Sequence, residues 1–281
     1  EAVIRAAITL KLCTFEETGA IIAAATTSIP EAPGSSRNWD YRFCWLRDAF
    51  FVVRALNALS DLETMANYLA YISNIIALTR GDHIQPVYGI GLEERLLETT
   101  ADFPGYQGMG PVRIGNQAHE HFQHDVYGNI VLATAQAFFD KRLFHPAGVD
   151  DFRRLEVVGD RAYSLHDQPD AGIWELRTRA RVHTSSSLMC WAALDRLAKI
   201  ASHLGISSTL WRTRAAKVKE TILANAWNDK RRAFVESFEA EYGRLPSLYA
   251  SQGFDTANLL ISALAQAAPS DPDAFRSALR A

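Results

Sequence analysis

The sequence has little cysteine and no long apolar run. Its three cysteines, Cys13, Cys44 and Cys190, are an odd number in no metal-ligand spacing, which favours reduced thiols over a disulfide framework or a zinc site. No stretch approaches the roughly 18 consecutive apolar residues that a membrane helix needs. The 29 basic and 32 acidic residues form no strong basic cluster, which argues against nucleic-acid binding. We therefore expect a cytoplasmic protein that binds neither a membrane nor nucleic acid.

Several catalytic motifs are also missing. Nucleotide-binding sites often contain a GxxxxGK[ST] motif or a GxGxxG motif after a strand. The glycine-rich segment 105–116 contains neither. The serines 185–187 lack the GxSxG elbow of a serine hydrolase. The three histidines His119, His121 and His124 could suggest a metal site. On a helix, however, His119 and His124 would lie on other faces than His121, so we interpret all three as ordinary helix-surface histidines. These absences predict no cofactor, no metal and no serine-hydrolase site.

Helical periodicity dominates what is present. Apolar residues recur in steps of three and four, and strand signals are short, as at 233–238, which disfavours an α/β sheet. Segment 46–59 is apolar around most of its circumference, which predicts a helix buried on most sides. We predict a single all-α domain with eight or nine helices, over 1–12, 46–59, 62–76, 116–139, 151–166, 190–204, 211–222, 254–266 and from 273.

Three long connections, 26–43, 80–115 and 168–182, are rich in glycine and proline. Loops longer than about 12 to 15 residues are uncommon in compact domains unless they are functional. All three carry clustered aromatic and charged residues. We therefore expect the chemistry of the protein to lie in these loops.

The segment Arg37–Asp48 packs two tryptophans, a tyrosine, three arginines and two aspartates into twelve positions. It ends with Arg47 and Asp48 at the first turn of the apolar helix, where free N–H groups and the helix dipole favour a carboxylate. One interpretation is an N-cap with a structural ion pair. The other is a site for a hydroxyl-rich ligand, because such a ligand needs fixed donors and acceptors beside an aromatic face such as Trp45.

A second cluster surrounds Glu175, which lies between Trp174 and Leu176. Packing against an indole would remove the carboxyl group partly from water and favour its protonated form, as a general acid requires. The alternative is a surface glutamate paired with Arg177 or Arg179. Spacing alone favours that alternative.

Five motifs in one order join these clusters: Thr26–Pro30 (TTSIP), Arg37–Asp48, Pro111–Asn116 (PVRIGN), Gly172–Glu175 (GIWE) and Met189–Arg196 (MCWAALDR). In this combination the sequence resembles bacterial glycoside hydrolase family 15, the glucoamylase-like enzymes, over essentially the whole chain. The resemblance implies an (α/α)6 toroid of six helical hairpins with the active site in a funnel at one end.

The resemblance also implies roles for single residues. Arg47 and Asp48 would hold the hydroxyls of the non-reducing terminal glucose, and Glu175 would be the general acid. The other residues expected to bind substrate are Tyr41, Trp45, Trp174, Arg113 and Arg177. The implied reaction is inverting hydrolysis of an α-glucosidic bond in a glucan or glucoside. α-Linked glucose oligomers, isomaltose-type linkages and trehalose all present the same terminal glucose.

An inverting site needs a second carboxylate, roughly 6.5 to 9.5 Å from the first. In the family this base lies near the C-terminus, and no matching motif occurs between Phe254 and Ala281. The clustered late carboxylates Glu236, Glu239 and Glu241 match no family motif. We therefore expect residues 1–281 to form a truncated catalytic domain that lacks the base, the final hairpins and an N-terminal β-sandwich, and that is catalytically poor alone.

A rival hypothesis is a non-catalytic helical toroid that binds carbohydrate or another partner. The enzyme hypothesis requires Glu175, Arg47 and Asp48 to converge in one pocket. The rival predicts an aromatic-lined cleft with no carboxylate opposite Glu175.

Overall fold

The computed structural model describes residues 1–79, 83–143 and 146–237. The helices predicted at 254–266 and from 273 lie outside the described residues, as do Glu239 and Glu241.

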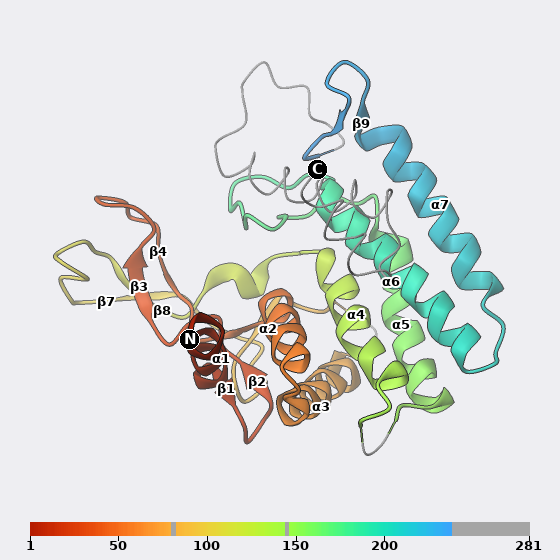
Figure 1. The fold of residues 1–281 in the computed structure, drawn as a ribbon. Helices are drawn as coiled ribbons and strands as arrows, with labels where there is room; N and C mark the ends of the chain where they lie inside the picture. The colour runs from red at the N-terminus through yellow and green to blue at the C-terminus, as the bar shows by residue number, and fades with distance from the viewer. Residues whose placement is uncertain (80–82, 144–145, 238–281) are drawn as a thin grey trace.

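Helices form most of the regular structure in these ranges. They are α1 (Ala2–Leu12), α2 (Leu46–Ala58), α3 (Leu62–Thr79), α4 (Asp125–Phe139), α5 (Val149–Leu165), α6 (Thr184–His203) and α7 (Thr209–Ala226). Successive helices pack in pairs, and α4 lies against α6 to join the pairs into one array (Figure 1). The predicted all-α class is confirmed. No helix in the described ranges is both long and apolar enough to cross a membrane.

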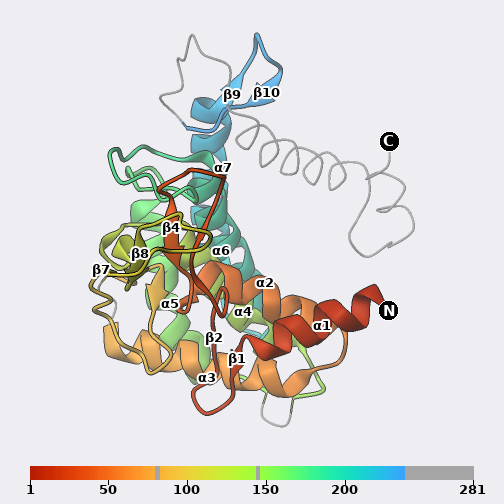
Figure 2. The same ribbon diagram turned by 90° about the vertical axis from the view of Figure 1, so that its left-hand side faces the viewer.

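Within the described residues, ten short strands lie in the connections as antiparallel pairs. The pairs are β1 (Thr14–Phe15) with β2 (Ala20–Ile21), β3 (Thr27–Pro30) with β4 (Asn38–Asp40), β5 (Cys44–Trp45) with β6 (Val87–Tyr88), β7 (Thr99–Ala101) with β8 (Val112–Ile114), and β9 (Trp227–Asn228) with β10 (Ala233–Phe234). The strand signal at 233–238 is thus confirmed at its first two residues. Strand β8 also packs on β3 and β4, on one side of the helices (Figure 2).

Apart from a small cluster of Trp45, Val87, Leu96 and Ala118, the described core is one large apolar cluster to which α2, α3, α4, α5, α6 and α7 all contribute. It contains tyrosines whose hydroxyls all need partners, because a buried polar group without a hydrogen bond is costly. Tyr68 of α3 donates to the carbonyl of Leu46 (3.2 Å), and Tyr71 donates to the carbonyl of Gly89 (2.7 Å). These bonds fix the start of α2 and the loop after β6 relative to α3.

The helix predicted over 116–139 begins only at Asp125, so its predicted start is wrong. Residues 116–124 instead form a 3-10 helix, η1 (Gln117–Glu120), and a short loop. The reason is local, since the side chain of Asn116 accepts a hydrogen bond from the N–H of Ala118 (2.9 Å) and caps η1. His119 and His124 are buried, which corrects their interpretation as helix-surface residues.

The expectation that the helix at 46–59 is buried on most sides is also wrong for the described part. Its buried residues, Leu46, Ala49, Phe50, Val53 and Leu56, occupy one face. Phe51 is 56% exposed and Leu59 is 51% exposed. An apolar composition shows that a helix can be covered, but its neighbours decide which faces are covered.

The contact between α4 and α6 generates a stability prediction. Gly128 of α4 lies so close to α6 that an added Cβ would stand 2.3 Å from the carbonyl oxygen of Met189. Gly128→Ala gains about 1 kcal/mol of helix propensity, but forcing the two backbones apart costs more. We expect a net loss of about 1 to 3 kcal/mol in the free energy of unfolding, measured by urea denaturation.

Gly148, the N-cap of α5, has no atom within 4 Å of an added Cβ and provides the control. Gly148→Ser should change the free energy of unfolding by no more than about 0.5 kcal/mol. Equal stability of the two variants would contradict the close approach of α4 and α6.

Candidate active site

A pocket of about 250 Å³ is lined by residues of two of the three long loops, 26–43 and 168–182. Its walls come from residues 23–48, from Asn116 and His121 next to η1, and from the loop 173–177. The expectation that the long connections gather the chemically useful side chains agrees with this placement for 26–43 and 168–182, whereas no residue of 80–115 lines the pocket.

Seven of the eight predicted site residues line this pocket. They are Tyr41, Trp45, Arg47, Asp48, Trp174, Glu175 and Arg177. Arg113 does not line it. The Arg47–Asp48 pair and Glu175 therefore converge, as the enzyme hypothesis requires, although their roles stay predictions.

The start of α2 sets the direction of Arg47 and Asp48. Strand β5 pairs with β6, and the N–H of Leu46 donates to the carbonyl of Pro86 (3.0 Å), so the chain enters α2 directly from a strand. The N-cap residue is Trp45, in an extended conformation, and no side chain caps this helix end. Asp48 is therefore not an N-cap. Its carboxylate lies in the first turn and is exposed to the pocket.

The loop that carries Glu175 is closed at its base. Asp170 and Arg181 exchange backbone hydrogen bonds of 2.8 and 3.0 Å. The buried carboxylate of Asp170 accepts from the N–H of His124 (2.7 Å) and the hydroxyl of Ser186 (2.7 Å). Burial raises the pKa of Asp170, although these two donors oppose the shift. The base of the loop is thus held to α6 and to the start of α4.

Glu175 itself has a left-handed backbone, with φ +51°. This region costs a residue with a side chain roughly 1 to 2 kcal/mol, and such strain occurs most often at functional sites. The conformation turns the side chain toward β5, where Oε1 accepts a hydrogen bond from the indole N–H of Trp45 (2.8 Å).

The surroundings of Glu175 differ from the expected ones. Trp174 is 40% exposed, and Trp45, which is buried, shields the carboxyl group instead. The nearest cation is Arg47, whose Nη2 lies 3.4 Å from Oε1. The alternative pairing with Arg177 is wrong, because Arg177 forms a bidentate ion pair with Glu98 (3.0 and 2.6 Å).

Arg47 is held from behind by residues that the sequence analysis missed. Its Nη1 donates to Oε1 of Gln123 (2.9 Å) and to Oδ2 of Asp125 (3.0 Å), and Asn129 donates to the same Oδ2 (3.1 Å). Burial opposes the charge on Arg47, but Asp125 and Glu175 raise its pKa. One sequence signal was available, since Asp125 and Asn129 are polar residues four apart at the start of an otherwise apolar helix.

The surroundings of the pocket also shift the pKa values of Asp48 and Tyr41. Asp48 lines the pocket, and partial desolvation there raises its pKa, while Arg47 opposes this shift and Glu175 adds to it. Burial, followed by the charges of Glu31 and Glu175, raises the pKa of Tyr41 to about 12. Tyr41 therefore keeps its hydroxyl proton near neutral pH and can donate it to a hydrogen bond.

The lining residues that were not predicted include Glu31, Arg37, Trp39 and His121. Glu31 accepts from the guanidinium of Arg37 (2.5 Å) and the indole N–H of Trp39 (2.8 Å). Burial lowers the pKa of His121, with Glu175 opposing this and Arg177 adding to it. His121 thus presents a neutral imidazole to the pocket at pH 7.

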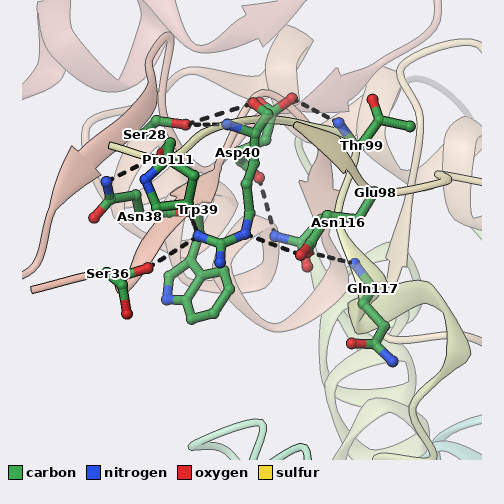
Figure 3. Close-up of polar contacts among 12 residues, drawn as sticks. Ser28, Ser36, Asn38, Trp39, Asp40, Glu98, Thr99, Pro111, Asn116 and Gln117 are labelled. Carbon is green, nitrogen blue, oxygen red and sulfur yellow. Dashed lines mark hydrogen bonds and ion pairs between the residues drawn. The ribbon is translucent and has the colours of Figure 1, made fainter. Parts of the chain in front are cut away.

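Arg113 lies behind the wall of the pocket. Its Nη1 donates to the carbonyls of Ser36 (3.0 Å) and Asn38 (2.8 Å), and its Nε pairs with Glu98 (3.0 Å). Figure 3 shows Ser36, Asn38, Trp39 and Glu98 gathered in this network. We therefore reinterpret Arg113 as a residue that holds the pocket wall, since its donors are taken by protein acceptors.

Neither a metal site nor a base from the late chain is found in the described part. There, no group of three or more His, Cys, Asp and Glu side chains could hold a metal ion. Glu236 is described but does not line the pocket.

Solved structures identify the class of the fold. A glycosidase structure matches 85% of this chain and 60% of its own, with a TM-score of 0.62 at 16% identity. A glucoamylase from Saccharomycopsis fibuligera matches 83% of this chain and 50% of its own, with a TM-score of 0.52 at 14% identity. The architecture is thus that of the glucoamylase-type (α/α)6 toroids, as the resemblance implied.

The family follows from sequence. The model of glycosyl hydrolases family 15 matches residues 1–278, and the chain belongs to this family. A trehalase from Thermoplasma volcanium is 35% identical over 91% of this chain and 41% of its own length. A trehalase from Mycolicibacterium smegmatis is 35% identical over 99% of this chain and 40% of its own. The chain spans about two fifths of the length of these curated relatives.

The buried ion pair behind the pocket leads to a prediction. Asp125 is 2% exposed, and its removal leaves the Arg47 guanidinium without its closest carboxylate. Asp125→Ala should lower the free energy of unfolding by about 2 to 4 kcal/mol, somewhat reduced because Arg47 keeps access to the pocket. Urea denaturation followed by tryptophan fluorescence measures this.

The matched control is Asp195→Ala, which removes a surface carboxylate paired with Lys199 one turn away on α6. That change should cost less than about 1 kcal/mol. If both variants lose the same small amount, the Arg47–Asp125 pair does not hold the pocket.

Proposed function

We propose that the protein hydrolyses an α-glucosidic bond at the non-reducing end of its substrate by an inverting acid–base mechanism. The observation that carries this proposal is the convergence of Glu175, Arg47 and Asp48 on one pocket. Membership of glycosyl hydrolases family 15 supports the reaction type.

Glu175 acts as the general acid in this proposal. Trp45 and Arg47 both reach Oε1, so Oε2 is the oxygen left to carry the proton and to give it to the glycosidic oxygen. The bond from Trp45 fixes the rotation of the carboxyl group. The side chain keeps 25% of its surface exposed, which leaves it accessible to the leaving-group oxygen.

Arg47 and Asp48 bind the terminal glucose. The contacts of Arg47 with Gln123 and Asp125 hold its guanidinium before substrate arrives, so little side-chain freedom is lost on binding. The open carboxylate of Asp48 accepts hydrogen bonds from sugar hydroxyls, and Tyr41 adds a donor. Hydrogen bonds to charged groups are stronger than those between neutral groups. This suits a pocket in which sugar hydroxyls must replace bound water.

The general base is assigned outside the described residues. The other carboxylates of the pocket are Glu31 and Asp48. Donors from Arg37 and Trp39 occupy Glu31, and Asp48 is assigned to the sugar. An inverting site needs a carboxylate across the pocket that activates water, and we propose that a later segment supplies it. The rival hypothesis, carbohydrate binding without turnover, predicts that no such carboxylate is present.

We propose trehalose as the substrate, because the relatives with 35% identity are trehalases. Trehalose consists of two glucose units joined through their anomeric carbons, so each end is a non-reducing glucose. Either end can enter the Arg47–Asp48 site, with the other glucose as the leaving group that receives the proton of Glu175.

The role of Glu175 is tested by Glu175→Gln in the full-length protein. This change keeps shape and polarity but removes the transferable proton, so kcat should fall by about 10² to 10⁴ with little change in KM. Asp48→Asn should lower kcat/KM instead, because it weakens the binding of the sugar. Glu120→Gln, at an exposed position outside the pocket lining, is the control and should keep wild-type rates. Wild-type turnover by Glu175→Gln would exclude Glu175 as the acid.

The stereochemistry is tested separately with trehalose, maltose and isomaltose as substrates. Inversion at one anomeric carbon of α,α-trehalose releases one β-glucose and one α-glucose, which early proton NMR spectra distinguish. Initial release of α-glucose alone would indicate retention. Binding of trehalose without hydrolysis would support the rival hypothesis, and faster hydrolysis of maltose would replace trehalose as the preferred substrate.

A further inference from the structure

Glu98, in the connection before β7, joins three separate segments with one carboxylate. It forms the bidentate ion pair with Arg177 (3.0 and 2.6 Å), an ion pair with Arg113 of β8 (3.0 Å), and a hydrogen bond from the N–H of Gln117 (3.2 Å). Its side chain is 17% exposed. Partial burial acts against its charge, but Arg177, Gln117 and Arg113 hold the pKa of Glu98 below its usual range. Glu98 is therefore ionised near neutral pH.

One of these contacts anchors the loop of Glu175. The Asp170–Arg181 pairing closes the base of that loop, and Arg177, two residues beyond Glu175, ties its far side to Glu98. Between the two anchors the backbone of Glu175 is left-handed. A strained conformation persists only where its surroundings hold it. The Arg177–Glu98 ion pair is placed to provide that support.

The second contact reaches the opposite wall. Arg113 donates to the carbonyls of Ser36 and Asn38, in the segment that leads directly to Trp39. The guanidinium carbons of Arg113 and Arg177 lie 4.6 and 4.2 Å from the ring centroid of Trp39. Cations at this distance are attracted to an indole ring. Glu98 thus pairs with both guanidinium groups that pack on a tryptophan of the pocket, and Figure 3 shows where Glu98 and Trp39 lie.

We propose that Glu98 is a positioning residue for Glu175, fixing the loop of the acid against the Trp39 wall and compensating the charges of Arg113 and Arg177. This inference rests on the proposed function of Glu175. Without the Glu98 carboxylate the two arginines leave an extra positive charge near the acid, which favours the ionised form of a carboxyl group.

Other charged or titratable groups also act on Glu175 and stay unchanged in the test. They are Arg47 and Asp48 on α2, Asp125 on α4 behind Arg47, Tyr41, Glu31 and Arg37 in and around the β3–β4 hairpin, and His121 after η1. Because these groups are common to all variants, a difference between variants reports the charge that was removed.

The test compares Glu98→Gln and Arg177→Gln in the full-length protein. Both variants lose the anchor, so both should lower kcat by about 10- to 100-fold. Glu98→Gln removes a negative charge near Glu175, whereas Arg177→Gln removes a positive charge. The basic limb of the kcat profile should therefore move to lower pH in Glu98→Gln and to higher pH in Arg177→Gln. Glu98→Asp, which keeps the charge, should leave the limb at its wild-type position. A merely structural role would not shift the limb in opposite directions.

Hydrogen exchange gives a readout that does not need turnover. Glu98→Gln should increase amide exchange in peptides that cover 171–180, and Asp195→Asn, which breaks the surface pair with Lys199, should not. Wild-type exchange and wild-type kcat profiles in Glu98→Gln would overturn the inference. If the wild-type protein hydrolyses no α-glucoside, the proposed function fails, while the exchange of residues 171–180 still decides whether Glu98 positions the loop.

Discussion

The ion pair between Arg47 and Asp125 is the interaction on which the rest of the site depends. It joins the first turns of α2 and α4, and both helix N-termini favour nearby carboxylates. Arg47 in turn reaches Glu175, so one guanidinium connects two helices to the loop of the acid. Without this cation, the buried carboxylate of Asp125 would lose its ion-pair partner.

The helices provide rigidity and the loops provide chemistry. The α4–α6 contact is close enough to exclude a methyl group at Gly128, and the tyrosine bonds of α3 fix where α2 begins. Short antiparallel strand pairs hold the connections between the helices in place. The result is a pocket in which Arg47, Glu175 and Glu31 are held by protein partners before any ligand arrives, as electrostatic preorganisation requires.

Three kinds of support act on the acid itself. The indole of Trp45 orients its carboxyl group, the Asp170–Arg181 pairing closes its loop, and Glu98 ties the far side of that loop to the wall. Neutral groups complete the surroundings, because burial keeps Tyr41 protonated and His121 uncharged. In the proposed reaction these supports keep a strained residue in the geometry of proton transfer.

The sequence by itself determined the all-α class and the family, and it predicted seven of the residues that line the pocket, because periodicity and motifs are local properties of the chain. Tertiary structure decided the rest. The partners Arg47 and Asp125 are 78 positions apart, and Arg177 and Glu98 are 79 apart, so no local pattern could pair them. No local pattern could show which face of α2 is exposed. Nor could it show that Arg113 donates to the distant carbonyls of Ser36 and Asn38. Burial and ion pairing depend on which segments meet, and packing decides that.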